Sequence, residues 1–235
     1  MKSFLAILLF AGFIQNSANK DYLLGRFDPS TDSRFVQLTA AQAKGNAVNR
    51  FLRKEAFEAF QKMASSARKD GVDLFIVSAT RTFDYQKKIW EDKWNGKIKV
   101  EGKNLTSITN LVDRAQLILK YSAMPGTSRH HWGTDIDLNS TEDDYFLTDE
   151  GIKVYQWLAT HATEFGFCQP YTSKVNGRTG YEEEKWHWSY LPLSKIYLTD
   201  YQKLIQYNDI AGFEGSETAG QLQIISSYVS GIACE

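Results

Sequence analysis

Histidine, cysteine and proline are all scarce in this sequence, whose 235 residues include four histidines, two cysteines and four prolines. An excess of charge of one sign is also missing, because 27 basic and 28 acidic residues are interspersed and leave a formal net charge of -1. This balance gives no electrostatic footprint for nucleic acid or an anionic membrane, and it fits a neutral or zwitterionic substrate. With 43% hydrophobic residues the chain can bury one sizeable core. We therefore expect one domain that binds no nucleic acid. A monomer is also expected, although the composition does not determine the oligomeric state.

The apolar run near the N-terminus is too short to span a membrane. It covers residues 4–14, follows Lys2, and gives way to polar and then small residues up to Ala18. A bilayer-spanning helix needs about 20 apolar residues, whereas this order is typical of a secretory signal peptide. We predict a cleaved signal over 1–18, a domain over 19–235, and export to the periplasm or the extracellular space with no membrane span after cleavage. An uncleaved anchor is the alternative.

The two cysteines, Cys168 and Cys234, lie far apart in the chain. Export makes them candidates for a disulfide that ties the C-terminal tail to the body of the domain. Two unpaired, buried thiols are the alternative. Neither cysteine has the spacing of a metal or redox motif, so we assign them no chemistry.

Hydrophobic periodicity predicts an α+β fold. Apolar residues three or four positions apart indicate an amphipathic helix over 51–67, and the apolar run that follows indicates a buried strand over 72–79. Further helices are predicted over 84–94, 108–120 and 149–165, the last capped by Thr148, and short strands over 134–138 and 185–190. Two tail helices are expected from Thr199 to Tyr207 and from Ser216 to Tyr228. The expected fold is a single domain with a small, mostly antiparallel sheet flanked by helices.

Three of the four histidines fall in two short clusters that also contain acids and tryptophans, over 128–137 and 184–188. Imidazole and carboxylate groups are donors that zinc prefers. A catalytic zinc site has three protein ligands and leaves a fourth position for water. His130, Asp137 and His187 meet that requirement, and they are the candidate ligands for one zinc ion on the sheet.

The neighbours of these ligands suggest further roles. Glu184 is the expected general base, although its place three residues before His187 suits a bend better than a straight strand. Strand alternation puts Trp186 and Trp188 on the face opposite His187, where we expect core packing. Asp135 either competes for the metal or holds an imidazole in place. His131 is expected to point away from the metal.

Three sequence elements carry a resemblance to a known family. The first cluster has the form Ser-x-His-x-x-Gly-x-x-x-Asp, and the second contains Glu-x-Trp-His. The segment 78–86 is similar to the family's Ser-Gly-Tyr-Arg-Ser-x-x-x-Gln element, and the three elements occur in the family's order. The chain thus resembles the zinc D-alanyl-D-alanine carboxypeptidases, which include the vancomycin-resistance D,D-carboxypeptidases.

This resemblance implies roles for seven residues. His130, Asp137 and His187 would hold zinc, Glu184 would be the catalytic base, and Arg81 would stabilise the oxyanion of the tetrahedral intermediate, a role suited to a guanidinium. Two more residues, Ser128 and Gln86, would line the peptide site.

The implied substrate is a peptidoglycan stem peptide that ends in D-alanine. Asp135 stands where the family usually has Ala, and Ala79 and Thr80 replace the usual Gly and Tyr, so the preferred bond stays open. The alternatives are an L,D-carboxypeptidase, a D,D-dipeptidase or a cell-wall endopeptidase on the same metal site, and a non-catalytic wall-binding module with structural zinc.

Overall fold

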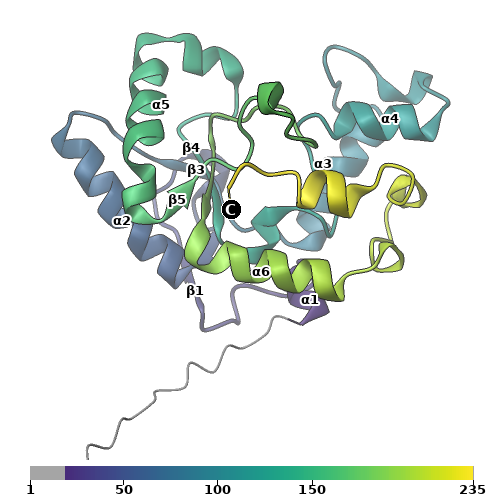
Figure 1. Cartoon of the computed structure of the whole chain (residues 1–235), viewed down its shortest axis with the longest axis horizontal. Coiled ribbons are helices and arrows are strands. Elements are labelled where there is room, and N and C mark those ends of the chain that lie inside the picture. Colours follow the sequence, from purple (N-terminus) through teal and green to yellow (C-terminus); the bar gives the residue numbers. More distant parts are fainter. Residues whose placement is uncertain (1–18, 235) are drawn as a thin grey trace, which may run out of the picture.

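A four-stranded antiparallel sheet lies at the centre of the chain, with helices on both sides (Figure 1). The structure is a computed structural model that describes residues 19–234, so the predicted signal segment lies outside the described residues. The strand order is β3-β4-β6-β5, and the strands are β3 (Ile76–Ser78), β4 (Asp135–Leu138), β6 (His187–Tyr190) and β5 (Phe167–Cys168). All three pairings are antiparallel. The predicted α+β class and the small antiparallel sheet are confirmed.

A separate two-stranded sheet leads into the first long helix. Strands β1 (Phe35–Gln37) and β2 (Phe51–Arg53) pair antiparallel, and α2 (Lys54–Lys69) follows β2 directly. The helix predicted over 51–67 therefore begins later than expected, at Lys54, because residues 51–53 form β2.

The two faces of the central sheet differ in chemistry because side chains alternate along each strand. Ile136, Leu138 and Trp188 belong to a hydrophobic cluster with residues of α2 and α5 (Asp149–His161). Asp137 is the register partner of His187 on the two central strands. The polar residues of β4 and β6 therefore share the face that turns away from this cluster.

The remaining helices cover the polar side of the sheet. In Figure 1, α2 and α5 flank the sheet on the left, and the helices on the right and below are α1 (Lys20–Leu23), α3 (Phe83–Trp94), α4 (Leu111–Ile118) and α6 (Leu191–Leu204). A second hydrophobic cluster packs these four helices against the C-terminal segment. Thr82 caps α3 by accepting a hydrogen bond from the Tyr85 backbone N–H at 3.3 Å.

Several predicted elements have different limits in the structure. The strand predicted over 72–79 is reduced to β3, and α5 ends at His161 although Thr148 caps it as predicted. The tail helix predicted over 199–207 is present in part, but its predicted start is wrong. It begins at Leu191, because Pro192 fits the first helical turn, where its missing N–H is not needed.

The second tail helix is also wrong, since only short helical turns cover 216–218 and 225–229. Gln223 lies between them with φ of 48°, in the left-handed region that interrupts a helix. Within residues 19–234, no helix is long and apolar enough to cross a bilayer.

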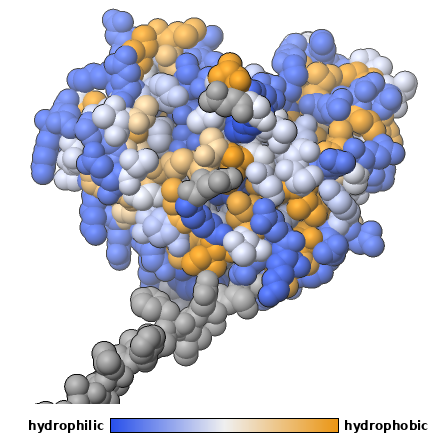
Figure 2. Space-filling view, viewed as in Figure 1, coloured by the Kyte–Doolittle hydropathy of each residue, from blue (hydrophilic) through white to orange (hydrophobic). Residues whose placement is uncertain are grey.

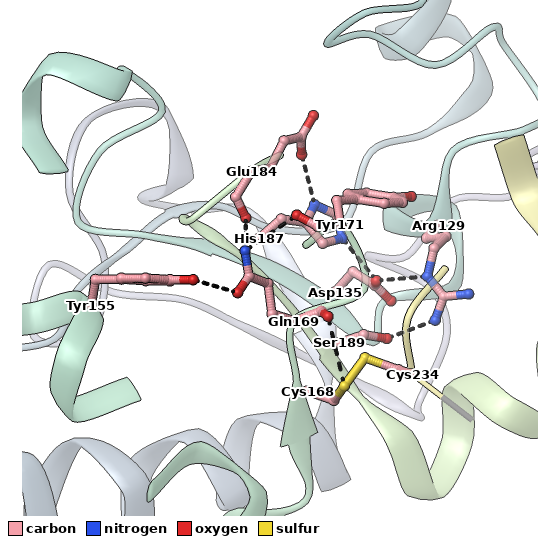
Figure 3. Close-up of a disulfide and its surroundings, with 10 residues drawn as sticks. All are labelled: Arg129, Asp135, Tyr155, Cys168, Gln169, Tyr171, Glu184, His187, Ser189 and Cys234. Atoms are coloured by element: carbon pink, nitrogen blue, oxygen red, sulfur yellow. Dashed lines mark hydrogen bonds and ion pairs between the residues drawn. A yellow bond between two sulfur atoms is a disulfide. The ribbon is translucent and has the colours of Figure 1, made fainter. Parts of the chain in front are cut away.

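A disulfide joins Cys168 at the end of β5 to Cys234 near the C-terminus (Figure 3). The Cα atoms of the two residues are 6.1 Å apart. The backbone N–H of Ala233 also donates to the carbonyl of Pro170 at 2.8 Å. Of the two alternatives for the cysteines, the structure shows the disulfide, which ties the tail to the body of the domain.

Candidate metal centre

Three buried side chains converge at the centre of the polar face. His130 comes from a 3₁₀ helix over Arg129–Trp132, Asp137 from β4 and His187 from β6. Their ligand atoms all lie within 4.8 Å of one another, and within the described part of the chain they form the one group of this kind that could hold a metal ion. The three ligands proposed from the sequence are thus brought together.

The outer hydrogen bonds of the two imidazoles decide which nitrogens face inward. Nδ1 of His130 lies 2.9 Å from the Ala79 carbonyl oxygen, so Nε2 points to Asp137 Oδ1 at 3.3 Å. Nε2 of His187 lies 2.9 Å from Asp135 Oδ1, so Nδ1 points to Asp137 Oδ1 at 3.1 Å. The inward set is therefore one Nε2, one Nδ1 and one carboxylate oxygen.

Two of these inward atoms are buried and lie 3.3 Å from each other, but neither makes a hydrogen bond of suitable geometry with any described residue. They are Nε2 of His130 and Oδ1 of Asp137. A buried polar atom without a partner loses its hydration without compensation. A cation coordinated by both atoms removes that cost, so the residues present fit a metal ion.

A glycine turn sets the angle between His130 and β4. Gly133 ends the 3₁₀ helix with φ of 71°, in the left-handed region. A Cβ atom at this position would lie 2.4 Å from Cε1 of Phe35. Both constraints favour glycine here, which explains why the loop can turn tightly between two ligands.

Asp135 is engaged outside the metal position. Its Oδ1 contacts His187 and accepts a hydrogen bond from Nε of Arg129 at 3.1 Å, and its Oδ2 accepts one from Thr134 at 2.6 Å. Arg129 is fixed in turn by Ser189 Oγ at 2.7 Å (Figure 3). Of the two roles considered for Asp135, the structure therefore shows the one in which it holds an imidazole.

The pKa values of these groups follow from burial and from their close contacts. Burial disfavours charge on His187, but its hydrogen bond to Asp135 and its close contact with the carboxylate of Asp137 raise its pKa to about 9. Burial also acts on Asp137, yet the neighbouring His130 and His187 hold its pKa well below the usual range. Burial and the charge of Arg81 lower the pKa of His130. Of the three ligand candidates, His187 is therefore the one that is protonated in the metal-free protein near neutral pH.

Glu184 reaches the same centre because the chain turns immediately before β6. The His187 N–H donates to the Glu184 carbonyl at 3.3 Å, so the straight-strand geometry that would separate the two side chains does not apply. One carboxylate oxygen of Glu184 lies 3.5 Å from His187 Nδ1. The amide of Gln169 supports the Glu184 carbonyl at 3.1 Å (Figure 3). Burial, reinforced by the charge of Asp137, raises the pKa of Glu184 to about 7.

Arg81 lies beside the ligands and is held on several sides. Its guanidinium donates to Asp137 Oδ2 at 3.0 Å, to Gln86 Oε1 at 3.2 Å and to Ser78 Oγ at 3.0 Å. Asp137 thus uses one oxygen for Arg81 and keeps the other for the metal position.

His131 points away from the metal, as expected. Its Nε2 accepts a hydrogen bond from the Gly126 N–H at 3.0 Å, which leaves its Nδ1–H to donate to the Arg81 carbonyl at 2.6 Å.

Gln86 lies behind Arg81 and not on the wall of the cleft. It is fully buried, and its amide nitrogen donates to the Ala123 carbonyl at 2.8 Å while its oxygen accepts from Arg81. Both ends of the amide are therefore satisfied by protein groups. This placement differs from the expected contact with substrate, and it makes Gln86 a support for the guanidinium.

A cleft of about 600 Å³ opens onto the centre. Its walls include the three ligand candidates together with Arg81, Ser128 and Glu184.

The two tryptophans next to His187 differ in position. Trp188 packs in the core as expected, but Trp186 lines the cleft. Strand β6 begins only at His187, so strand alternation does not apply to Trp186. Sequence reasoning also missed Tyr171, whose ring centroid lies 4.7 Å from that of His187, since nothing in its local sequence marks it.

The comparison with protein families agrees with this geometry. The family model VanY, described as D-alanyl-D-alanine carboxypeptidase, matches residues 49–193. The Bacillus subtilis (strain 168) protein YodJ is 28% identical over 195 residues, covering 82% of this chain and 63% of YodJ. A D-alanyl-D-alanine carboxypeptidase of Enterococcus faecalis is 30% identical over 140 residues, covering 58% of this chain and 48% of the relative. The chain thus spans less than two thirds of the length of either relative.

Solved structures share the fold. VanYB in complex with D-alanine-D-alanine superposes with a TM-score of 0.51 at 24% identity, covering 74% of this chain and 85% of VanYB. The LD-carboxypeptidase LdcB gives a TM-score of 0.54 at 23% identity, with 77% of each chain covered. A VanY variant in complex with Zn(II) gives 0.52 at 24% identity, covering 79% of this chain and 93% of the other. Since the family model spans more than half of the sequence and includes every residue of the centre, the chain belongs to the VanY family of D-alanyl-D-alanine carboxypeptidases.

Proposed function

We propose that this chain is an exported, zinc-dependent peptidase that removes the terminal D-alanine from peptidoglycan stem peptides. Its membership of the VanY family supports the reaction class. The observation that carries the proposal is the pair of buried, unpartnered atoms, Nε2 of His130 and Oδ1 of Asp137, beside Nδ1 of His187 at the base of the cleft. The disulfide between Cys168 and Cys234 supports export, because such bonds persist in oxidising compartments.

Zinc is the metal that the donor set favours. Two imidazoles and one carboxylate are a common protein ligand set for catalytic zinc, and the VanY variant with a similar fold was solved with Zn(II). In such sites zinc lowers the pKa of water to about 7 and stabilises negative charge on a substrate oxygen. His130, Asp137 and His187 would hold the ion.

Glu184 is proposed to move the protons of the reaction. Its buried carboxylate faces the metal position, and a pKa of about 7 lets it both accept and release a proton near neutrality. It accepts a proton from the water that attacks the peptide carbonyl. When the C–N bond breaks, it returns that proton to the departing amine, so the products are a shortened peptide acid and D-alanine.

Arg81 is proposed to bind the oxyanion that forms when water adds to the carbonyl. Its guanidinium is permanently charged and presents several donors. Ser78, Gln86 and Asp137 hold it in place before substrate arrives, so little reorganisation is needed during the reaction. Ser128 lines the same cleft, where its hydroxyl is proposed to contact the peptide.

An L,D-carboxypeptidase is the second candidate. The LdcB structure, described as an LD-carboxypeptidase, is as similar in fold as the VanY structures. The two activities differ in the stereochemistry on the acyl side of the bond. That preference is proposed to lie in the cleft walls. Ala79 and Thr80, which depart from the family pattern, are buried beside the cleft and do not line it.

Digestion of defined muropeptides tests the proposal directly. The zinc-loaded protein is incubated with stem pentapeptide and, separately, with stem tetrapeptide, and the products are identified by mass spectrometry. We expect loss of one D-alanine from the pentapeptide, and about a 100- to 10,000-fold lower rate in Glu184→Gln with its zinc retained. Cleavage of the tetrapeptide alone would establish the L,D activity instead, and full activity of the Glu184→Gln protein would refute the role of Glu184.

A further inference from the structure

The cleft contains a lysine that the reaction described above does not use. Lys93 lies on α3 and, with Tyr85 and Ile89, lines the cleft. Successive residues in this set are four positions apart, so all three share one face of the helix. Lys93 is therefore part of the cleft wall and does not belong to the outer surface of α3.

The ammonium group of Lys93 has no carboxylate partner. It is half-buried, and its one hydrogen bond is to the hydroxyl of the buried Ser122. Within residues 19–234 no acid lies within ion-pair distance of it, whereas Lys88 on the same helix pairs with Asp92. Burial and the charge of Arg81 lower the pKa of Lys93, while the charges of Glu184 and Glu142 oppose this.

An ammonium group removed from water is stabilised by a bound anion. Every substrate of a carboxypeptidase supplies one, because its last residue ends in a free carboxylate. The same cleft contains Glu184, whose charge acts on Lys93. A terminal residue that lies between the two can direct its scissile nitrogen to Glu184 and its carboxylate to Lys93.

Contacts behind the cleft wall connect Arg81 with the segment that holds Lys93. Gln86 contacts Arg81 on one side and the Ala123 carbonyl on the other, and the neighbouring residue Ser122 holds Lys93. Gln86 is fully buried and does not line the cleft, so it is not available to the peptide terminus. We propose that Lys93 binds the terminal carboxylate of the peptide and so selects substrates with a free C-terminus, an inference that rests on the proposed peptidase function.

Binding of a dipeptide and of its amide separates this role from a structural one. The probes are D-alanyl-D-alanine and D-alanyl-D-alanine amide, titrated by calorimetry into the zinc-loaded Glu184→Gln protein, which also carries Lys93→Met in one sample and Lys88→Met in the matched control. A charge-assisted contact predicts that Lys93→Met weakens binding of the free acid by about 10- to 100-fold. Binding of the amide should change less than about threefold.

Lys93→Arg is expected to restore part of the preference for the acid, and Lys88→Met to leave it unchanged. Equal losses for acid and amide, no loss for the acid, or an original protein that does not prefer the acid would each overturn the proposal. D-Alanine release by the unaltered zinc enzyme is measured in parallel. A preference for the acid without any release would refute the proposed peptidase function and leave the role of Lys93 standing.

Discussion

The two faces of β4 show how differently one strand can use adjacent residues. Ile136 and Leu138 are fully buried among apolar side chains of α2 and α5, where any well-packed hydrophobic residue would serve. Asp135 and Asp137 are equally buried on the other face, but each of their oxygens has a defined position. The apolar face therefore contributes to stability through its packing. The polar face holds the oxygens in the positions that the proposed metal site needs.

The two aspartates sharpen this difference further. Asp135 has both oxygens hydrogen bonded to protein groups, whereas Asp137 binds Arg81 with one oxygen and leaves the other without a hydrogen bond. Asp135 therefore acts as a support, whereas the free oxygen of Asp137 fits a ligand of a cation.

Truncation of the apolar face should have the largest effect on folding and little effect on the metal. Leu138→Ala removes a fully buried side chain, and we expect the free energy of unfolding to fall by about 2 to 5 kcal/mol. Denaturant unfolding measures that loss, and zinc titration of the folded variant should give nearly the original affinity. A large loss of zinc affinity would show that the two faces are not independent.

Substitution of Asp135 should affect the metal without removing a ligand. Asp135→Asn weakens the contact that holds His187, so we expect zinc affinity to fall by about 10- to 100-fold, as measured by competition with a chelator. Because the change leaves the buried Arg129 without a charge partner, the double variant Arg129→Met/Asp135→Asn is measured as well. Asp143→Asn, at a residue that lines the same cleft, is the matched control. Unchanged affinity in both altered proteins would contradict the supporting role.

Zinc binding should depend on pH through His187. The pKa of about 9 means that this imidazole is protonated in the metal-free protein at pH 7, and zinc binds the neutral form. Affinity should therefore rise about tenfold per pH unit from pH 7 to pH 9 and level off above that, with about one proton released at pH 7.

Calorimetry in buffers of different ionisation enthalpy counts the proton released, and the Glu184→Gln background removes the carboxylate that also titrates near pH 7. A flat affinity across this range would show that His187 is already neutral before the metal binds.

The sequence predicted those parts of the molecule that depend on local pattern. Alternation placed Trp188 in the core on the face opposite His187, and Thr148 was identified as a helix cap. The scarcity of histidine drew attention to the candidate ligands, which lie together in the structure. Their role in binding zinc stays a prediction.

The parts that were missed depend on contacts between distant segments. The burial of Gln86 follows from its fit between Arg81 and the Ala123 carbonyl, and the position of Lys93 follows from the packing of α3. The turn that brings Glu184 to the centre is stabilised by Gln169, fifteen residues earlier. Periodicity along a single element contains no information on any of these contacts.

The most direct test of the metal centre compares two histidines. Zinc per chain is measured by native mass spectrometry and elemental analysis for the unaltered protein, His187→Ala and His161→Ala, the last at a partly exposed histidine that pairs with Glu164 away from the cleft. The proposed centre predicts one tightly bound zinc ion in the unaltered protein and in His161→Ala, and none in His187→Ala. One equivalent of tightly bound zinc in folded His187→Ala protein would contradict it.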